Sequence, residues 1–100
     1  MHHADIYLKN NKVIVSGSLH FANVMSIYKK SLSLLANVPE YHFDLSGLTS
    51  SDSSGLALIL EWLASAKKNQ KSVKLYAVPQ YLLSIAKAAR MDEMISAVSI

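Results

Sequence analysis

The sequence predicts a single small α/β domain over residues 1–100, with a mixed, mostly parallel sheet of four to five strands and helices mainly on one face. Three observations favour this class. The chain has 100 residues, the size of one domain. Strand-like and helix-like patterns alternate along most of it, as in parallel sheets with right-handed crossovers. Two short apolar runs at the start lie close enough together to form an antiparallel hairpin.

The opening hairpin is predicted from two runs and the turn between them. Ile6 and Leu8 alternate with polar or amphipathic neighbours, which indicates a short strand. Residues 10–12, Asn-Asn-Lys, are a turn signal. Residues 13–15, Val-Ile-Val, predict a second strand that ends at residues 16–18, Ser-Gly-Ser.

From about Phe21 the apolar period becomes helical. The apolar face expected for this helix comprises Phe21, Val24, Met25, Tyr28, Leu32 and Leu35. The helix should end before Pro39, because the residue preceding a proline avoids the α region. Residues 41–45, Tyr-His-Phe-Asp-Leu, then predict a third strand.

The strongest helical pattern runs from Leu56 to about Lys68. The side chains expected to cover the sheet are Leu56, Ile59, Leu60 and Leu63. Those expected to point away from it are Ala57, Glu61 and Ser65. Leu58 and Trp62 lie beside the core stripe. Trp62 is either an exposed anchor for a partner or packed under the neighbouring helix, and the sequence leaves both open.

The last third of the chain predicts one more strand and one more helix. The strand covers residues 73–78 and is ended by Pro79. The helix covers residues 81–90, and its expected buried face is Leu82, Ile85, Ala86 and Ala89. The tail, residues 94–100, is half apolar and is compatible with a strand or a turn.

The composition excludes several classes of function. The chain has no cysteine, which excludes disulfides, cysteine zinc sites and thiol catalysis. The net charge of +3 comes from scattered basic residues and short pairs such as Lys29–Lys30, which favours a solvated rim over a nucleic-acid stripe. A weak attraction to anionic lipid headgroups stays open. No stretch is long enough to cross a bilayer, and we expect no export signal.

The hydrophobic fraction hints at a partner. It is 51%, high for a domain of this size, so some apolar side chains have no place in a single core.

His2 and His3, at the chain end, make a poor metal site. We therefore expect neither a metal nor a cofactor.

The chemistry-bearing stretch is residues 46–60, "SGLTSSDSSGLALIL". Its polar half is expected to be a loop at the carboxyl end of the sheet, where open α/β sheets place their functional groups. A helix that begins within residues 52–55 has unpaired N–H groups that favour an anion. Ser53 is then a phosphate acceptor or a first-turn residue, and Asp52 is the better candidate for the N-cap.

Two enzyme classes fit poorly. Residues 52–55, Asp-Ser-Ser-Gly, are similar to the Asp-Ser/Thr-Gly of aspartic proteases, but one extra residue separates the acid from the glycine. A serine hydrolase would need Gly-x-Ser-x-Gly and a positioned histidine, and no glycine stands two residues before Ser53. The internal histidines are His20 and His42, and His42 is expected to be an ordinary strand residue. We predict that the protein is not an enzyme.

The run "FDLSGLTSSDSSGLALIL", residues 43–60, resembles the signature of STAS domains. That signature is a strand ending in Asp-Leu-Ser, followed by Asp-Ser/Thr-x-Gly-Leu at a helix start. The order of the predicted elements matches over nearly the whole chain. The resemblance implies a docking and regulatory module. Two branches fit: the anti-sigma-factor antagonists, switched by a kinase that phosphorylates the serine, and the MlaB accessory subunits of bacterial phospholipid-transport ABC complexes.

The run from residue 53 to residue 78 is closer to the MlaB branch. The resemblance then implies an MlaF-like ATPase subunit as partner, or an anti-sigma kinase in the other branch, and a cytoplasmic location peripheral to the inner membrane through that partner. Ser53 matches the key hydroxyl. The residues expected to bind the partner are Asp44, Asp52, Ser53, Ser54, Ala57, Leu58, Glu61 and Trp62. Ser50 and Ser51 depart from the family, which usually has apolar residues there.

Overall fold

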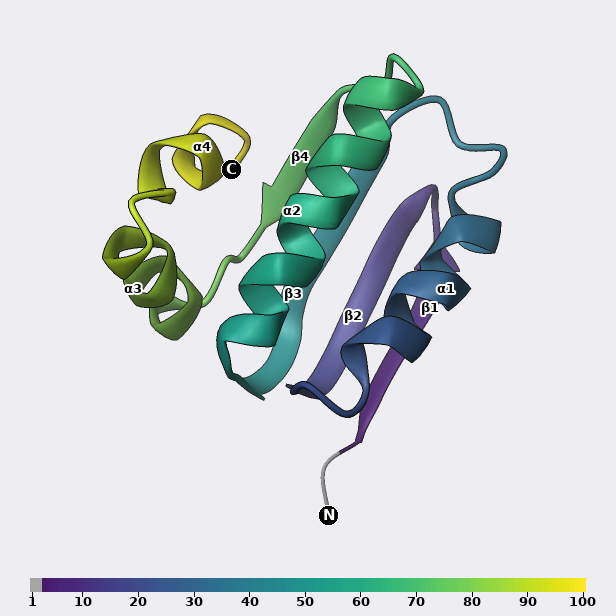
Figure 1. Cartoon of the computed structure of the whole chain (residues 1–100). Helices are drawn as coiled ribbons and strands as arrows, with labels where there is room; N and C mark the ends of the chain where they lie inside the picture. The colour runs from purple at the N-terminus through teal and green to yellow at the C-terminus, as the bar shows by residue number, and fades with distance from the viewer. Residues whose placement is uncertain (1–2) are drawn as a thin grey trace.

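The computed structural model describes residues 3–100 of the chain, so His2 lies outside the described residues. Strands and helices alternate along most of the chain (Figure 1). In chain order they are β1 (Ala4–Lys9), β2 (Lys12–Leu19), α1 (Val24–Leu34), β3 (Tyr41–Ser51), α2 (Ser53–Lys68), β4 (Val73–Tyr76), α3 (Gln80–Ala88) and α4 (Asp92–Ala97).

The four strands form one mixed sheet in the order β1-β2-β3-β4. β1 and β2 are antiparallel, with Lys9 opposite Lys12 around a two-residue turn. Asn10 and Asn11 both have positive φ, 53° and 63°, as a type I′ hairpin turn requires. β3 runs parallel to β2 on one side and to β4 on the other. The predicted hairpin and the mixed, mostly parallel sheet are confirmed.

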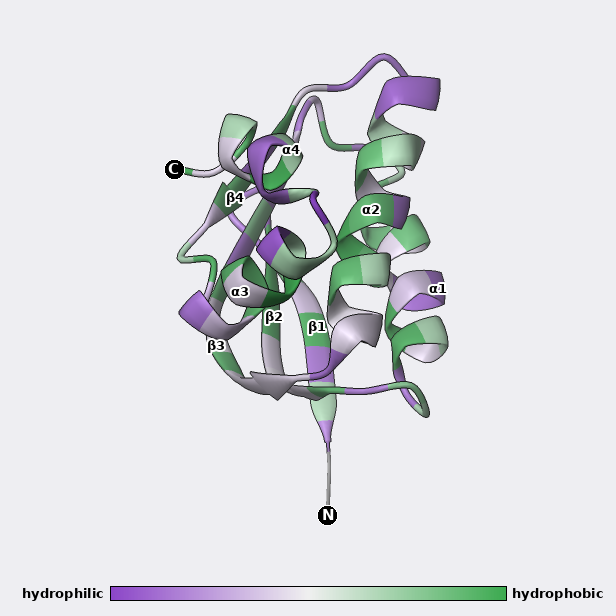
Figure 2. Ribbon diagram, turned by 60° about the vertical axis from the view of Figure 1, so that its left-hand side comes forward, coloured by the Kyte–Doolittle hydropathy of each residue, from purple (hydrophilic) through white to green (hydrophobic). Residues whose placement is uncertain are grey.

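The helices cover one face of the sheet and its β4 edge (Figures 1 and 2). The strand residues that face them are almost fully buried: Val13, Val15, Phe43, Leu45 and Leu75. α1 packs on β1 and β2, α2 packs on β3, and α3 lies between α2 and α4. The other face carries side chains that are partly or fully exposed, among them Tyr7, Ile14 and Tyr76. The predicted α/β class with helices mainly on one face is confirmed.

Two central strands are longer than the sequence predicts. β2 continues through residues 16–18 to Leu19, and β3 continues through residues 46–51, so the expectation of a loop there is wrong. The extensions pair with each other: Ser18 lies opposite Ser50, and each of the two register shifts in the ladder places one extra residue on the β3 side. Gly17 has φ +87° within this segment, a conformation that L side chains rarely adopt.

α1 buries a different face from the one that its apolar residues predict. The side chains turned into the core are Ile27, Ser31 and, just past the helix end, Leu35. Phe21, Met25 and Leu32 are instead 86%, 64% and 44% exposed. The predicted face of α1 is wrong for these three residues, because Ile27 and Ser31 occupy the centre of the buried stripe instead. Leu35 is buried as expected, and Val24 and Tyr28 are partly buried against the core. The exposed residues add apolar surface to the molecule.

The C-terminal third ends the sheet early. β4 stops at Tyr76, before Ala77, whose φ of 57° cannot continue a strand. α3 buries Leu82 and Ala86 as expected, and Ile85 is partly buried, but Ala89 lies past the helix end and is exposed, so the prediction is wrong for Ala89. The tail is neither strand nor turn alone: it forms α4 and then a single parallel bridge from Ser99 to Leu75. Among the helices of residues 3–100, none is both long and apolar enough to span a membrane.

Candidate functional site

Asp52 begins α2 and ties it to the segment before α1. Its backbone is extended, and one carboxylate oxygen accepts a hydrogen bond from the Ser54 amide at 2.8 Å. The other oxygen accepts from the Phe21 amide at 3.3 Å. Desolvation raises the pKa of Asp52, but the hydrogen bonds from Ser54 and Phe21 outweigh it and bring the pKa below its ordinary value. The prediction that Asp52 rather than Ser53 caps the helix is confirmed.

Hydroxyl groups surround this helix start. Ser53 is the first residue of α2 and is exposed. The Ser18 and Ser50 hydroxyls bond to each other at 2.6 Å, and the Ser51 hydroxyl donates to the carbonyl of Asp52 at 2.8 Å. Ser53 is therefore an exposed hydroxyl at the start of α2, where the positive end of the helix dipole favours added negative charge.

Gly55 lets α2 start tight against the end of β3. A Cβ placed on Gly55 would collide with the Ser51 hydroxyl and would lie 3.3 Å from Cδ2 of Leu82. The φ of Gly55 lies outside the left-handed region, so backbone conformation does not require a glycine here. The close approach of Ser51 and Leu82 does.

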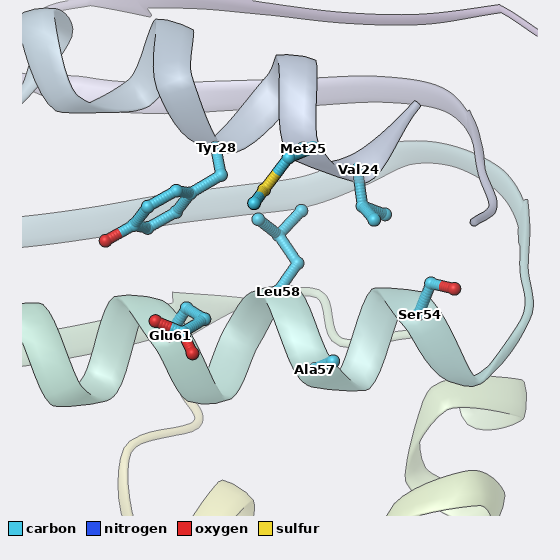
Figure 3. A pocket seen from close by; sticks show the side chains of 7 residues that line it. All are labelled: Val24, Met25, Tyr28, Ser54, Ala57, Leu58 and Glu61. Carbon is cyan, nitrogen blue, oxygen red and sulfur yellow. The ribbon is translucent and has the colours of Figure 1, made fainter. Parts of the chain in front are cut away.

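An apolar groove lies between α1 and α2, next to this helix start. Its cavity is about 260 Å³, and it is lined by Val24, Met25, Tyr28, Ser54, Ala57, Leu58 and Glu61. In Figure 3, Leu58 extends from α2 toward α1, and Met25 extends from α1 toward α2. Leu58 is 3% exposed and Met25 is 64% exposed. Leu58 is therefore part of the floor, and Met25 forms the rim.

Four of the eight residues expected to bind a partner meet at this groove. Ser54, Ala57, Leu58 and Glu61 line it. Asp52 and Ser53 precede Ser54 in the chain but do not line the groove, and Asp52 lines a separate cavity beside His20.

Trp62 does not belong to this surface. Its side chain is 0% exposed, so the interpretation of Trp62 as an exposed partner anchor is wrong, and the alternative of packing under the neighbouring helix is confirmed. The indole stacks on Phe43 of β3 with ring centroids 4.1 Å apart. Its Nε1 donates a hydrogen bond to the Ser31 hydroxyl of α1 at 2.9 Å. Trp62 thus joins α2 to both the sheet and α1.

Asp44 also lies elsewhere. It alternates along β3 with Phe43 and Leu45, which point into the core, so it points to the uncovered face of the sheet. The hydrogen bond from the Ser46 amide at 2.9 Å holds the pKa of Asp44 below its ordinary value. The structure does not bring Asp44 together with the other predicted partner residues.

The two internal histidines lie in different surroundings. His42 contacts Tyr76 Oη at 2.7 Å and Glu40 at 3.0 Å on the uncovered face of the sheet. The hydrogen bond from His42 holds the pKa of Glu40 below its usual value. His20 lines a cavity of about 270 Å³ with Asp52 and residues of β2 and β3. Within residues 3–100, no three His, Asp or Glu side chains gather as metal ligands would.

The sequence model described as "Mlab, STAS domain" matches residues 2–96. The chain belongs to the STAS domain family. No curated protein sequence is similar enough to count as a match. Among solved structures, this STAS domain is similar to a candidate anti-sigma factor antagonist from Thermotoga maritima, with a TM-score of 0.72. The identity is 17%, over 92% of this chain and 82% of the other, so the likeness shows the shared fold.

The α1 wall of the groove was missed from the sequence. Val24, Met25 and Tyr28 were assigned to a buried helix face, whereas in this STAS domain they line a surface groove. The signal that pointed to it was the high hydrophobic fraction, which left more apolar side chains than one core needs.

Proposed function

We propose that this STAS domain is a non-enzymatic, MlaB-like subunit that binds and regulates the ATPase of a phospholipid-transport ABC complex. The observation that carries the proposal is the apolar groove between α1 and α2, whose lining on α2 begins at Ser54, in the first turn of the helix. The partner is an MlaF-like ATPase subunit. Through it the domain acts in the cytoplasm at the inner membrane, in the maintenance of outer-membrane lipid asymmetry.

Exposed apolar side chains support a partner at this groove. Met25 and Phe21 are 64% and 86% exposed on the α1 side. Apolar surface removed from water stabilises a complex by about 25 cal/mol per Å² before the costs of association. The unbranched methionine side chain adapts to the shape of the surface that covers it. Patches of this kind on a small domain mark interaction sites.

The domain regulates the ATPase if the two conformations of the ATPase bind the groove with different affinities. A bound protein shifts a conformational equilibrium only by the difference between its affinities for the two states. The apolar groove spans two helices that the buried Trp62–Ser31 hydrogen bond holds together. The domain is therefore a rigid ligand, suited to favour one arrangement of its partner.

Co-expression with the MlaF-like ATPase subunit of the same genome tests the proposal. We expect a stable complex in size-exclusion chromatography, and we expect Ser53→Glu or Ala57→Arg to weaken it. An acidic residue near the N-terminus of α2 is favourable to the helix, so weaker binding of Ser53→Glu would not reflect unfolding. Ser84→Glu, an exposed change on α3, is the matched control. Absence of a complex, or complexes insensitive to both Ser53→Glu and Ala57→Arg, would contradict the proposal.

The second candidate is an anti-sigma-factor antagonist switched by phosphorylation of Ser53. The exposure of Ser53 at the start of α2 favours it, because the positive end of the helix dipole stabilises a phosphate there. Intact mass after incubation with the candidate kinase and ATP decides it. One added phosphate that is lost in Ser53→Ala supports this function, and an unmodified mass or a phosphate on another residue rejects it.

A further inference from the structure

The apolar groove continues into a longer depression along α1 and α2. A second cavity, of about 440 Å³, is lined by Tyr28, Leu32, Glu61, Ala64, Ser65, Lys68 and Asn69. Tyr28 and Glu61 line both cavities, so the two meet at these residues. The lining residues of α2 recur three, four and seven positions apart, which is the spacing of one helix face. The two cavities together are termed the α1–α2 furrow.

The length of the furrow suits a helix. At a rise of about 1.5 Å per residue, the stretch of α2 from Ser54 to Lys68 is roughly 21 Å long. A partner helix of about four turns would span it and pack between α1 and α2 as a third helix. Amphipathic helices bind in grooves of this kind through apolar residues spaced three and four apart.

The chemistry of the furrow changes in a fixed order along its length. The end near Ser54 is apolar, with Val24 and Leu58 between the helices. Glu61 supplies a carboxylate at the middle, and Lys68 supplies an ammonium group at the far end. Within residues 3–100, no basic side chain forms an ion pair with Glu61. Its carboxylate is available to a partner.

We infer that the α1–α2 furrow binds an amphipathic helix of the partner protein. This helix places an apolar side chain over Leu58, a basic side chain opposite Glu61 and an acidic side chain opposite Lys68. The inference rests on the proposed function only for the identity of the partner. The order of apolar, acidic and basic groups along the furrow is a feature of this chain alone. A helix inserted in the reverse direction would oppose like charges, so the charges select the direction of binding.

The carboxylate distinguishes a helix from a lipid chain in this place. An acyl chain would fill the apolar end but would leave the unpaired carboxylate of Glu61 beside it, at the entrance to the other half of the furrow. Covering an unpaired charge with apolar groups is unfavourable. A basic side chain removes that cost and adds a charge-assisted hydrogen bond.

Charge reversal in the complex with the ATPase subunit tests the inference. The dissociation constant is measured by fluorescence anisotropy for the chain and for Glu61→Lys, with Glu93→Lys on α4 as the matched control, since both glutamates are exposed. We expect Glu61→Lys to weaken binding by about tenfold or more, because it opposes two cations, and Glu93→Lys by less than about twofold. Equal effects of the two variants would overturn the inference while leaving the proposed partner in place.

A designed peptide separates failure of the inference from failure of the proposed function. The probe is a helical peptide of about 16 residues with two leucines one turn apart, then lysine, then glutamate two turns further on. Its control has the lysine and the glutamate exchanged. We expect the first peptide to bind more tightly, and Glu61→Lys to remove the difference. If the ATPase does not bind but the peptides are distinguished, the partner is wrong and the furrow inference holds.

Two results of the peptide experiment would overturn the inference. One is binding of both peptides with equal affinity, or of neither. The other is saturable binding of a fluorescent fatty acid that displaces the first peptide and is unchanged in Glu61→Lys, which would assign the apolar end to a lipid chain.

Discussion

Replacement of Ser31 by alanine tests whether the buried hydrogen bond between α1 and α2 holds the two helices together. The Ser31 hydroxyl accepts from Nε1 of Trp62 at 2.9 Å and donates to the carbonyl of Tyr28 at 2.5 Å. Ser31 and Trp62 are both 0% exposed, so the indole N–H has no access to water once the hydroxyl is removed. An unpaired buried donor costs about 1–3 kcal/mol.

The expected loss of stability follows from two opposing contributions. Alanine is a better helix former than serine by about 0.5 kcal/mol, which offsets part of the cost of the unpaired N–H. We expect a net loss of about 1–2 kcal/mol in the free energy of unfolding. With a urea m-value of about 1–3 kcal/mol/M, the midpoint should fall by roughly 1 M. The chain has one tryptophan, so its fluorescence reports unfolding directly.

Ser33→Ala is the matched control on the same helix. The Ser33 hydroxyl donates to the carbonyl of Lys30 at 3.0 Å, the same local bond that Ser31 makes, but Ser33 is exposed. We expect Ser33→Ala to change stability by less than about 0.5 kcal/mol. In a Trp62→Phe background, followed by circular dichroism, Ser31→Ala should lose most of its cost, since the N–H is gone. An equal effect of Ser31→Ala and Ser33→Ala would refute the reasoning.

Three further changes probe the helix starts and the face of α1. Asp52→Ala should cost about 1 kcal/mol at pH 7. Because hydrogen bonds hold the folded pKa of Asp52 below its ordinary value, this cost should be complete above the ordinary pKa and decrease as the pH falls through the folded pKa, and urea titrations at a series of decreasing pH values would show the decrease. Gly55→Ala should lower the urea midpoint, because the added Cβ collides with the Ser51 hydroxyl. The additional change Ser51→Ala should restore part of the lost stability. If it restores none, the collision is not the cause of the loss. Phe21→Ser should stay within about 0.5 kcal/mol of the parent, whereas Ile27→Ala should cost about 2–5 kcal/mol, and thermal unfolding that ranks them the other way would contradict the observed face of α1.

Features set by local interactions could be predicted from the sequence. The Asn10–Asn11 turn forms because asparagine tolerates positive φ, and its formation depends only on residues that are adjacent in the chain. Asp52 caps α2 because a carboxylate at a helix start accepts hydrogen bonds from amides two residues away. The alternation of strands and helices then led to the α/β class, and the run around Ser53 led to the family. These inferences needed no knowledge of distant contacts.

The candidate site depended on contacts that the sequence does not display. The apolar period of α1 marked Phe21 and Met25 for the core, but the core holds Ser31, whose hydroxyl is satisfied by Trp62 from a helix thirty-one residues further on. With Ser31 bonded to the buried tryptophan, α1 turns Ile27 and Ser31 into the core, and Met25 lies at the rim of the furrow. Asp44 lies on the uncovered face because it alternates along β3 with Phe43 and Leu45, and only the packing of the helices decides which face of β3 is covered. Periodicity states which residues share a face, whereas only packing between elements decides which face is covered.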